Sequence, residues 1–148
     1  MTIRDARPGE RAALEGLQRR ASDVWEEYRA DLAAHPDAIV LDPGLIEAGR
    51  VRVAESPSGE VLGFSAVLAP EDDACVLDGL FVEPGAMRGG IGRALVEDAA
   101  RRGRAEGASS IDVIANPRAT GFYEQVGFVV GKPAQTRFGP ARWMHLAL

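Results

Sequence analysis

Residues 74–106 constrain the fold more than any other part of the chain, because an apolar run, a glycine-rich turn and an amphipathic pattern follow one another there. The run "ACVLDGLFV" is apolar at nearly every position, which is typical of a central strand covered on both faces. From Gly90 to Glu106, apolar residues recur at helical spacing: Ile91, Ala94, Leu95 and Ala99. Gly107 offers the C-terminal stop of a helix. The sequence therefore predicts a buried strand that passes through a glycine turn into an amphipathic helix.

Other extended patterns lie before and after this strand, turn and helix. They cover residues 3–6, 50–55, 61–68, 110–115, 128–130 and 142–148. The turn "SPSG" joins the second and third of them, which predicts an antiparallel hairpin. A chain of 148 residues, 46% of them hydrophobic, can bury one core but is short for two. We therefore expect a single domain over residues 1–148.

Four shorter helical patterns complete the chain. A first helix presents one apolar face: Leu14, Leu17 and Ala21. Ser22 is a candidate cap for a second helix, which ends before Pro36 and repeats the same spacing: Trp25, Tyr28 and Leu32. Asp42 and Pro43 predict a short helix closed by Gly49, and "NPRATGFYEQV" predicts another that begins at its Asn-Pro pair and ends at Gly127.

The charge and the residue counts exclude several kinds of partner. A net charge of −5 argues against nucleic acid, since binding to phosphate backbones relies on clustered Lys and Arg. One cysteine, Cys75, and two separated histidines, His35 and His145, lack the spacing of a zinc site, so we expect no metal. The first residues are polar, and no apolar run approaches the roughly 20 residues that span a bilayer. We expect a cytoplasmic protein without a membrane partner.

The glycine turn "MRGGIG" has the properties of an anion site. Backbone N–H groups at a helix start lack intrahelical partners, the helix dipole is positive there, and glycine allows a phosphate to approach closely. The turn lacks the Gly-Lys-Ser/Thr ending of a P-loop and the third glycine of a dinucleotide fingerprint. The alternative is that the glycines only make a tight connection between strand and helix.

Two ordered motifs resemble the GNAT superfamily of acyl-CoA-dependent N-acetyltransferases. "LFVEPGAMRGGIGRALVEDA" is similar to its Gln/Arg-x-x-Gly-x-Gly/Ala signature, with Gly90 and Gly92 as the two glycines, and "NPRATGFYEQVGF" is similar to its downstream Asn, Phe-Tyr and Gly-Phe segment. The resemblance covers Cys75 to Val130. It implies an α/β fold with a mixed, mainly antiparallel sheet of about seven strands, helices on both faces, and a split between the fourth and fifth strands that admits CoA.

The resemblance also implies where acetyl-CoA, the expected co-substrate, would bind. Met87 and Gly89 depart from the family pattern, which has Gln or Arg at the first of these positions and often a basic residue at the second. Backbone amides tolerate both changes, and Arg88 and Arg93 either add charge beside the pyrophosphate or are solvated surface residues. The residues implied for acetyl-CoA are Leu80, Phe81, Val82, Met87, Arg88, Gly89, Gly90, Ile91, Gly92, Arg93 and Asn116.

The implied reaction is N-acetylation of a primary amine by direct attack in a ternary complex. By resemblance, Tyr123 protonates the departing thiolate; its alternative role is that of a core aromatic residue. Asn116 either contacts the CoA arm or caps a helix. A main-chain N–H near Leu80 would stabilise the oxyanion.

Asp78 stands in an apolar strand, on the face of Val76, Leu80 and Val82, so we expect its carboxylate to be buried. Three roles are open for it: the base, an ammonium-binding group, or one partner of an ion pair.

The acceptor end of the site is the part that the motifs cover least. The family commonly places the second helix and the segment "TRFGPAR" there, so Trp25, Tyr28 and Arg137 are candidates, although Trp and Tyr at helical spacing also suit a core. We expect a small-molecule or peptide amine as acceptor and leave a homodimer open. Two other functions compete: a non-catalytic acyl-CoA-binding or sensing domain, and a nucleotide-binding protein.

Overall fold

The computed structural model describes all 148 residues, which form two compact units. The first unit contains Met1–Ala66 and Gly79–Leu95, and the second contains Val67–Asp78 and Val96–Leu148. The chain crosses from one unit to the other within β3, β4 and α4. Each unit therefore holds part of the strand and part of the helix that the sequence singled out, and the turn between them belongs to the first unit.

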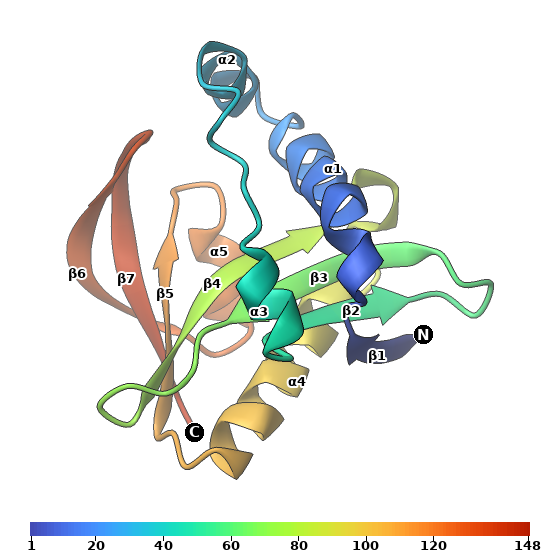
Figure 1. Cartoon of the computed structure of the whole chain (residues 1–148). Coiled ribbons are helices and arrows are strands. Elements are labelled where there is room, and N and C mark those ends of the chain that lie inside the picture. The colour runs from blue at the N-terminus through green and yellow to red at the C-terminus, as the bar shows by residue number, and fades with distance from the viewer. The chain divides into compact units, whose positions relative to one another are not determined.

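Seven strands form one sheet in the order β1-β2-β3-β4-β5-β7-β6 (Figure 1). The β4–β5 pair is parallel, and β1–β2, β2–β3, β5–β7 and β6–β7 are antiparallel, which confirms the prediction of a mixed, mainly antiparallel sheet. The elements are β1 (Thr2–Asp5), η1 (Pro8–Glu10), α1 (Arg11–Ser22), α2 (Glu26–Ala34), α3 (Pro43–Glu47), β2 (Val51–Glu55), β3 (Val61–Val67), β4 (Ala74–Val82), η2 (Pro84–Ala86), α4 (Ile91–Ala105), β5 (Ser110–Ala115), α5 (Thr120–Gln125), β6 (Val129–Thr136) and β7 (Gly139–Ala147).

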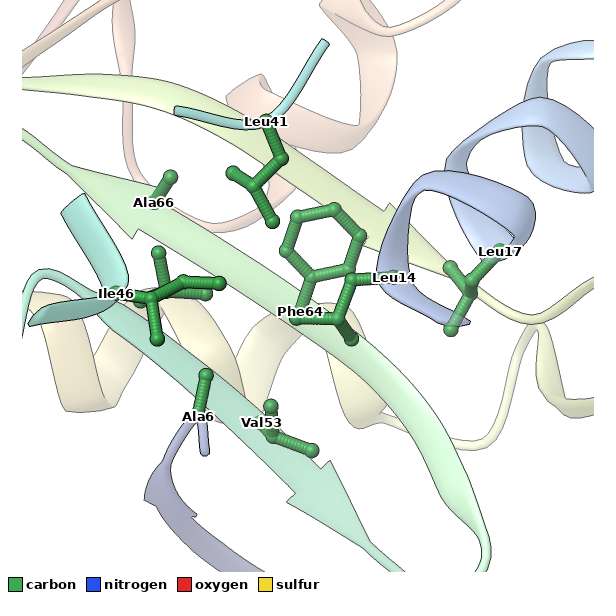
Figure 2. Close-up of a cluster of buried hydrophobic side chains, with 9 residues drawn as sticks. Ala6, Leu14, Leu17, Leu41, Ile46, Val53, Phe64 and Ala66 are labelled. Carbon is green, nitrogen blue, oxygen red and sulfur yellow. The ribbon is translucent and has the colours of Figure 1, made fainter. Parts of the chain in front are cut away.

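In the first unit, helices cover both faces of the sheet. Leu14 of α1 and Ile46 of α3 pack in one cluster with Phe64 of β3 (Figure 2). Ala54 points to the opposite face, where it packs with Ile91 and Leu95 of α4. This division follows from the two-residue period of a strand, which sends successive side chains to opposite faces.

In the second unit, β4 and β5 pair over Ala74–Val76 and Ser110–Asp112. Beside this pairing, α4 approaches the sheet closely at Gly103, where an added Cβ would lie 2.9 Å from Leu148 Cδ1 and 3.8 Å from Cys75 Sγ. Cys75 is buried and reduced. Gly103 is buried there, and a side chain at position 103 would require the end of the Leu148 side chain to move.

Several element boundaries differ from the sequence predictions. Ser22 does not cap α2: it is the last residue of α1, and its Oγ donates a hydrogen bond to the Gln18 carbonyl, while α2 begins at Glu26. Asp42 does cap α3, because its Oδ1 accepts from the Gly44 N–H at 2.8 Å. Hydroxyl groups also bond carbonyls of the preceding turn, so Ser at a helix boundary does not decide between a start and an end.

The last two strands are longer than predicted. They form a hairpin whose paired residues continue to Thr136 and Gly139, so "TRFGPAR" contains the hairpin end rather than a loop before the last strand. Thr136 Oγ1 donates a hydrogen bond to the Gly139 carbonyl at 2.8 Å across this turn. Pro133 argues against a strand at this place in the sequence, but proline is tolerated in an edge strand such as β6. None of the helices combines the length and apolar character of a membrane-spanning segment.

Candidate active site

The glycine turn, residues 87–92, connects η2 to the first residues of α4 in the first unit. Gly90 has φ +79° and Arg88 has φ +70°, so two positions adopt the left-handed conformation. The Ala94 N–H donates to the Gly90 carbonyl at 3.0 Å, which starts the helical hydrogen-bond pattern. The residues from Met87 to Gly90 are exposed. The turn thus presents its backbone to solvent at the positive end of a helix.

The core holds this exposed turn in place. Ile91 is 7% exposed and packs in a cluster with Leu95, with Leu80 and Val82 of β4 and with Ala86 beside them. In β3, a Cβ added to Gly63 would lie 2.8 Å from the Phe81 carbonyl oxygen and 3.2 Å from Ile91 Cγ2. The end of β4 and the start of α4 are therefore packed closely around β3, and the backbone between them is suited to binding an anion.

Tyr123 lies in the second unit, on α5, where it is 6% exposed. Its ring meets those of Phe122 and Phe128 edge-on, at centroid distances of 5.2 and 5.1 Å. Burial raises the pKa of Tyr123 above its ordinary value, because the apolar surroundings disfavour the phenolate. The phenol therefore keeps its proton near neutral pH.

Asn116 forms the turn that precedes α5. Its Oδ1 accepts hydrogen bonds from the Arg118 and Ala119 N–H groups at 2.9 and 3.1 Å. The helix itself begins at Thr120, four residues after the predicted Asn-Pro start, because Asn116 to Ala119 form this side-chain-capped turn. The structure thus places the side-chain oxygen of Asn116 in local capping.

The structure corrects the expected surroundings of Asp78. This residue is exposed in the second unit, so the prediction of a buried carboxylate is wrong. The apolar run misled because alternate residues of β4 differ in burial: Leu77 is buried beside Asp78. Glu83, which follows β4, forms an ion pair with Arg20, which lowers the pKa of the Glu83 carboxyl and makes it a poor proton acceptor.

The acceptor-site candidates lie in different units. Trp25 and Tyr28 belong to the first unit, and Trp25 is 37% exposed at the start of α2, whereas Leu32 is the residue of that helix that is buried. Trp25 is therefore not a core residue. Arg137 belongs to the second unit, at the end of the β6–β7 hairpin, with its guanidinium 5.6 Å from the centroid of the Phe138 ring.

The predicted site residues thus divide between the two units. The first unit holds the end of β4 and the whole glycine turn, from Leu80 to Arg93, and the second holds Asp78, Asn116, Tyr123 and Arg137.

The sequence did not predict the hydrogen bond of Arg20 to Glu83, because the two residues are 63 positions apart and the contact has no local signal. No group of three or more His, Cys, Asp or Glu side chains is arranged to hold a metal ion.

Solved structures resemble the fold of this chain at low sequence identity. The PaiA N-acetyltransferase from Thermoplasma acidophilum, solved with coenzyme A, has 17% identity and a TM-score of 0.77, with 99% of this chain and 98% of that chain covered. The yncA protein from Salmonella typhimurium, solved with its cofactor acetyl-CoA, has 20% identity and a TM-score of 0.73, with 100% and 94% covered. Nourseothricin acetyltransferase has 22% identity and a TM-score of 0.61, with 66% of this chain and 64% of that chain covered.

Similarity at these identities shows the fold alone. A comparison with curated proteins finds no match. The sequence itself matches the acetyltransferase (GNAT) domain over residues 47–130, a range that includes the β2–β3 hairpin, the glycine turn and Tyr123. Because this match extends over more than half of the 148 residues, the protein belongs to the GNAT acetyltransferase family.

Proposed function

We propose that the protein transfers an acetyl group from acetyl-CoA to a primary amine, by direct attack of the amine in a ternary complex. The observation that carries this proposal is the exposed glycine turn at the N-terminus of α4, in a chain that belongs to an acetyltransferase family. Amides at a helix start bind anionic groups, and the diphosphate of CoA is such a group. Solved proteins of the same fold carry CoA or acetyl-CoA, which supports the same ligand here.

The residues of the first unit would bind and orient the donor. Backbone amides of residues 87–92 would bind the pyrophosphate, with Arg88 and Arg93 adding positive charge. Backbone groups of Leu80, Phe81 and Val82 would pair with the pantetheine arm, and a main-chain N–H near Leu80 would stabilise the oxyanion. The amine nitrogen would form the C–N bond at the thioester carbon, and the C–S bond would break when the oxyanion collapses and the thiolate leaves.

Tyr123 would supply the proton that the departing thiolate needs. Its raised pKa supports this role in one respect, because the donor is protonated at every working pH. The same shift makes Tyr123 a weaker acid than an ordinary tyrosine, so the raised pKa does not by itself favour proton transfer. The incoming amine must lose a proton as well, and Asp78 or a water relay would accept it. The exposure of Asp78 is compatible with the approach of an ammonium group.

We further propose that the two compact units fold together as one domain over residues 1–148. The family match begins in the first unit and ends in the second, and β3, β4 and α4 belong to both. A single cooperative unfolding transition by two probes supports this proposal, and two separate transitions contradict it.

The acceptor is proposed to be a small-molecule or peptide amine, since the related folds include an enzyme named for nourseothricin.

Calorimetry with acetyl-CoA, ATP and NAD tests the donor. Selective binding of acetyl-CoA is expected, and equal or better binding of ATP or NAD would favour a nucleotide-binding protein. A screen of amines with detection of released thiol then tests catalysis. Amine-dependent thiol release is the expected result. Tight acetyl-CoA binding without release for any amine class, including peptides, would favour the non-catalytic acyl-CoA-binding alternative.

A further inference from the structure

A bidentate ion pair joins Arg20 of α1 to Glu83, the residue after β4, within the first unit. Arg20 Nε lies 2.7 Å from Glu83 Oε1, and Arg20 Nη2 lies 2.8 Å from Glu83 Oε2. This parallel arrangement fixes the orientation of both side chains as well as their separation. Glu83 is the residue that follows β4 and precedes η2, so it occupies the approach to the glycine turn.

The core determines where Arg20 stands. Leu14 and Leu17, on the buried face of α1, are 0% and 1% exposed, so the helix is firmly seated on the sheet. Gly16, one turn before Arg20, leaves space for its side chain: an added Cβ would lie 3.3 Å from Arg20 Nη1. The guanidinium therefore projects from a fixed helix.

Glu83 is held by its backbone as well as by its side chain. Its N–H donates to the Leu62 carbonyl at 2.8 Å, and its own carbonyl accepts from the Ala86 N–H at 2.8 Å. The first bond fastens Glu83 to β3, and the second closes η2. The ion pair with Arg20 adds a third point, and three points define the direction in which the chain leaves the sheet toward residues 87–92.

We propose that Arg20 and Glu83 are positioning residues, which hold the glycine turn in the geometry that binds acetyl-CoA. This inference rests on the proposed function, because it concerns the donor site of that reaction. Neither residue needs to contact acetyl-CoA. The pair acts through the backbone of residues 83–86, and α1, which leads to Trp25 and α2, thereby becomes part of the support of the donor site.

The exposure of the pair makes this role separable from global stability. The side chains of Arg20 and Glu83 are 57% and 29% exposed, and ion pairs in contact with water contribute little to the free energy of unfolding. The pKa of Glu83 is lowered first of all by its hydrogen bonds to Arg20, so the carboxylate is charged near neutral pH and the pair persists there. Variants that break the pair should therefore fold.

Arg20→Gln and Glu83→Gln test the proposal, with Arg104→Gln as a control that removes one exposed charge from the second unit. We expect the Kd for acetyl-CoA to rise about fivefold in each Arg20 and Glu83 variant, a size found for residues that act through others. The double variant should resemble the single ones, kcat at saturating acetyl-CoA should stay within about twofold, and the control should match the wild type.

The exchanged pair Arg20→Glu with Glu83→Arg provides the rescue experiment. Recovery of most of the wild-type Kd is expected, because the charges and their separation are restored. Hydrogen exchange gives a readout that needs no acetyl-CoA: the Glu83 and Ala86 amides should exchange about fivefold faster in Arg20→Gln, in proportion to the loss of local support.

The outcomes separate this inference from the proposed function. An unchanged Kd and unchanged exchange in Arg20→Gln, with or without a lower melting temperature, would show that the pair has no positioning role. If the wild type does not bind acetyl-CoA, the proposed donor is wrong. Faster amide exchange in Arg20→Gln would then still support the structural part of the inference. Binding that weakens equally in Arg104→Gln would assign the effect to net charge and contradict the proposal.

Discussion

The ring of Tyr123 lies edge-on to the ring of Phe128, with centroids 5.1 Å apart and planes at 67°. The backbones of the two residues are joined as well, since the Phe128 N–H donates to the Tyr123 carbonyl at 2.9 Å. Gly127 between them has φ +104°, which allows the chain to reverse from α5 toward β6. Packing and backbone together hold the Tyr123 ring independently of its hydroxyl group.

Tyr123→Phe should therefore lower turnover without loosening the fold. The ring contacts remain, and only the proton donor is removed, so kcat is expected to fall on the order of 100-fold, the contribution typical of a general acid. The Kd for acetyl-CoA should change little. Rates are measured with saturating amine, in single turnovers, so that chemistry is observed rather than product release. An unchanged single-turnover rate would remove Tyr123 from the mechanism.

Alkaline pH should destabilise the protein through the same residue. The folded state keeps the Tyr123 proton above pH 10, where the unfolded chain releases it, so the stability that is present below about pH 10 falls as the pH rises. The expected loss approaches about 1.4 kcal/mol per pH unit. Denaturant unfolding at pH 9, 10 and 11 measures it. Tyr123→Phe should show a shallower decline, and an equal decline would assign the effect to other groups.

Gly90→Val should weaken acetyl-CoA binding about tenfold or more, because the left-handed backbone of the glycine turn is disfavoured for a β-branched residue. Gly107→Val is a matched control, since its φ of +86° is close to the +79° of Gly90 and an added Cβ meets nothing within 4 Å at either site. Both variants should lose stability by at least about 1–2 kcal/mol. Calorimetry should find weak binding only for Gly90→Val; comparable Kd values for both variants would exclude the turn as the binding site.

Arg88→Asn should separate the charge of Arg88 from its backbone conformation. Asparagine tolerates the left-handed region that Arg88 occupies at φ +70°, so the turn should keep its shape while the positive charge is lost. If Arg88 adds charge beside the pyrophosphate, the Kd for acetyl-CoA rises several-fold and depends less on salt between about 0.05 and 0.5 M. A wild-type Kd at both salt concentrations would identify Arg88 as a solvated surface residue.

Asp78→Asn should distinguish a chemical from a structural role of this exposed residue in the middle of β4. An exposed carboxylate contributes little to stability, so the free energy of unfolding should change by no more than about 0.5 kcal/mol. If Asp78 accepts the proton or attracts the ammonium, kcat/KM for the amine falls about 100-fold while acetyl-CoA binding persists. Normal kcat/KM in a stable variant would leave a water relay as the proton acceptor.

The sequence itself predicted the elements whose signals are local. Gly90, Gly107 and Gly127 all have positive φ where glycine was expected to start or end an element, and Asp42 caps α3 as predicted. The two GNAT motifs led to the family that the domain match over residues 47–130 confirms. These features need few neighbours, because backbone conformation and capping depend on residues close in sequence.

Tertiary structure alone decided burial and long-range pairing. Asp78 is exposed although its strand is apolar, and Tyr123 is buried although it stands on a short, partly polar helix. Arg20 bonds to Glu83, 63 positions away in the sequence. His145 Nδ1 lies 2.8 Å from Asp112 Oδ1, although the two residues are 33 positions apart. Periodicity predicts which side chains share a face of one element, but which faces meet depends on how all the strands and helices pack, because burial is a property of the assembled surfaces.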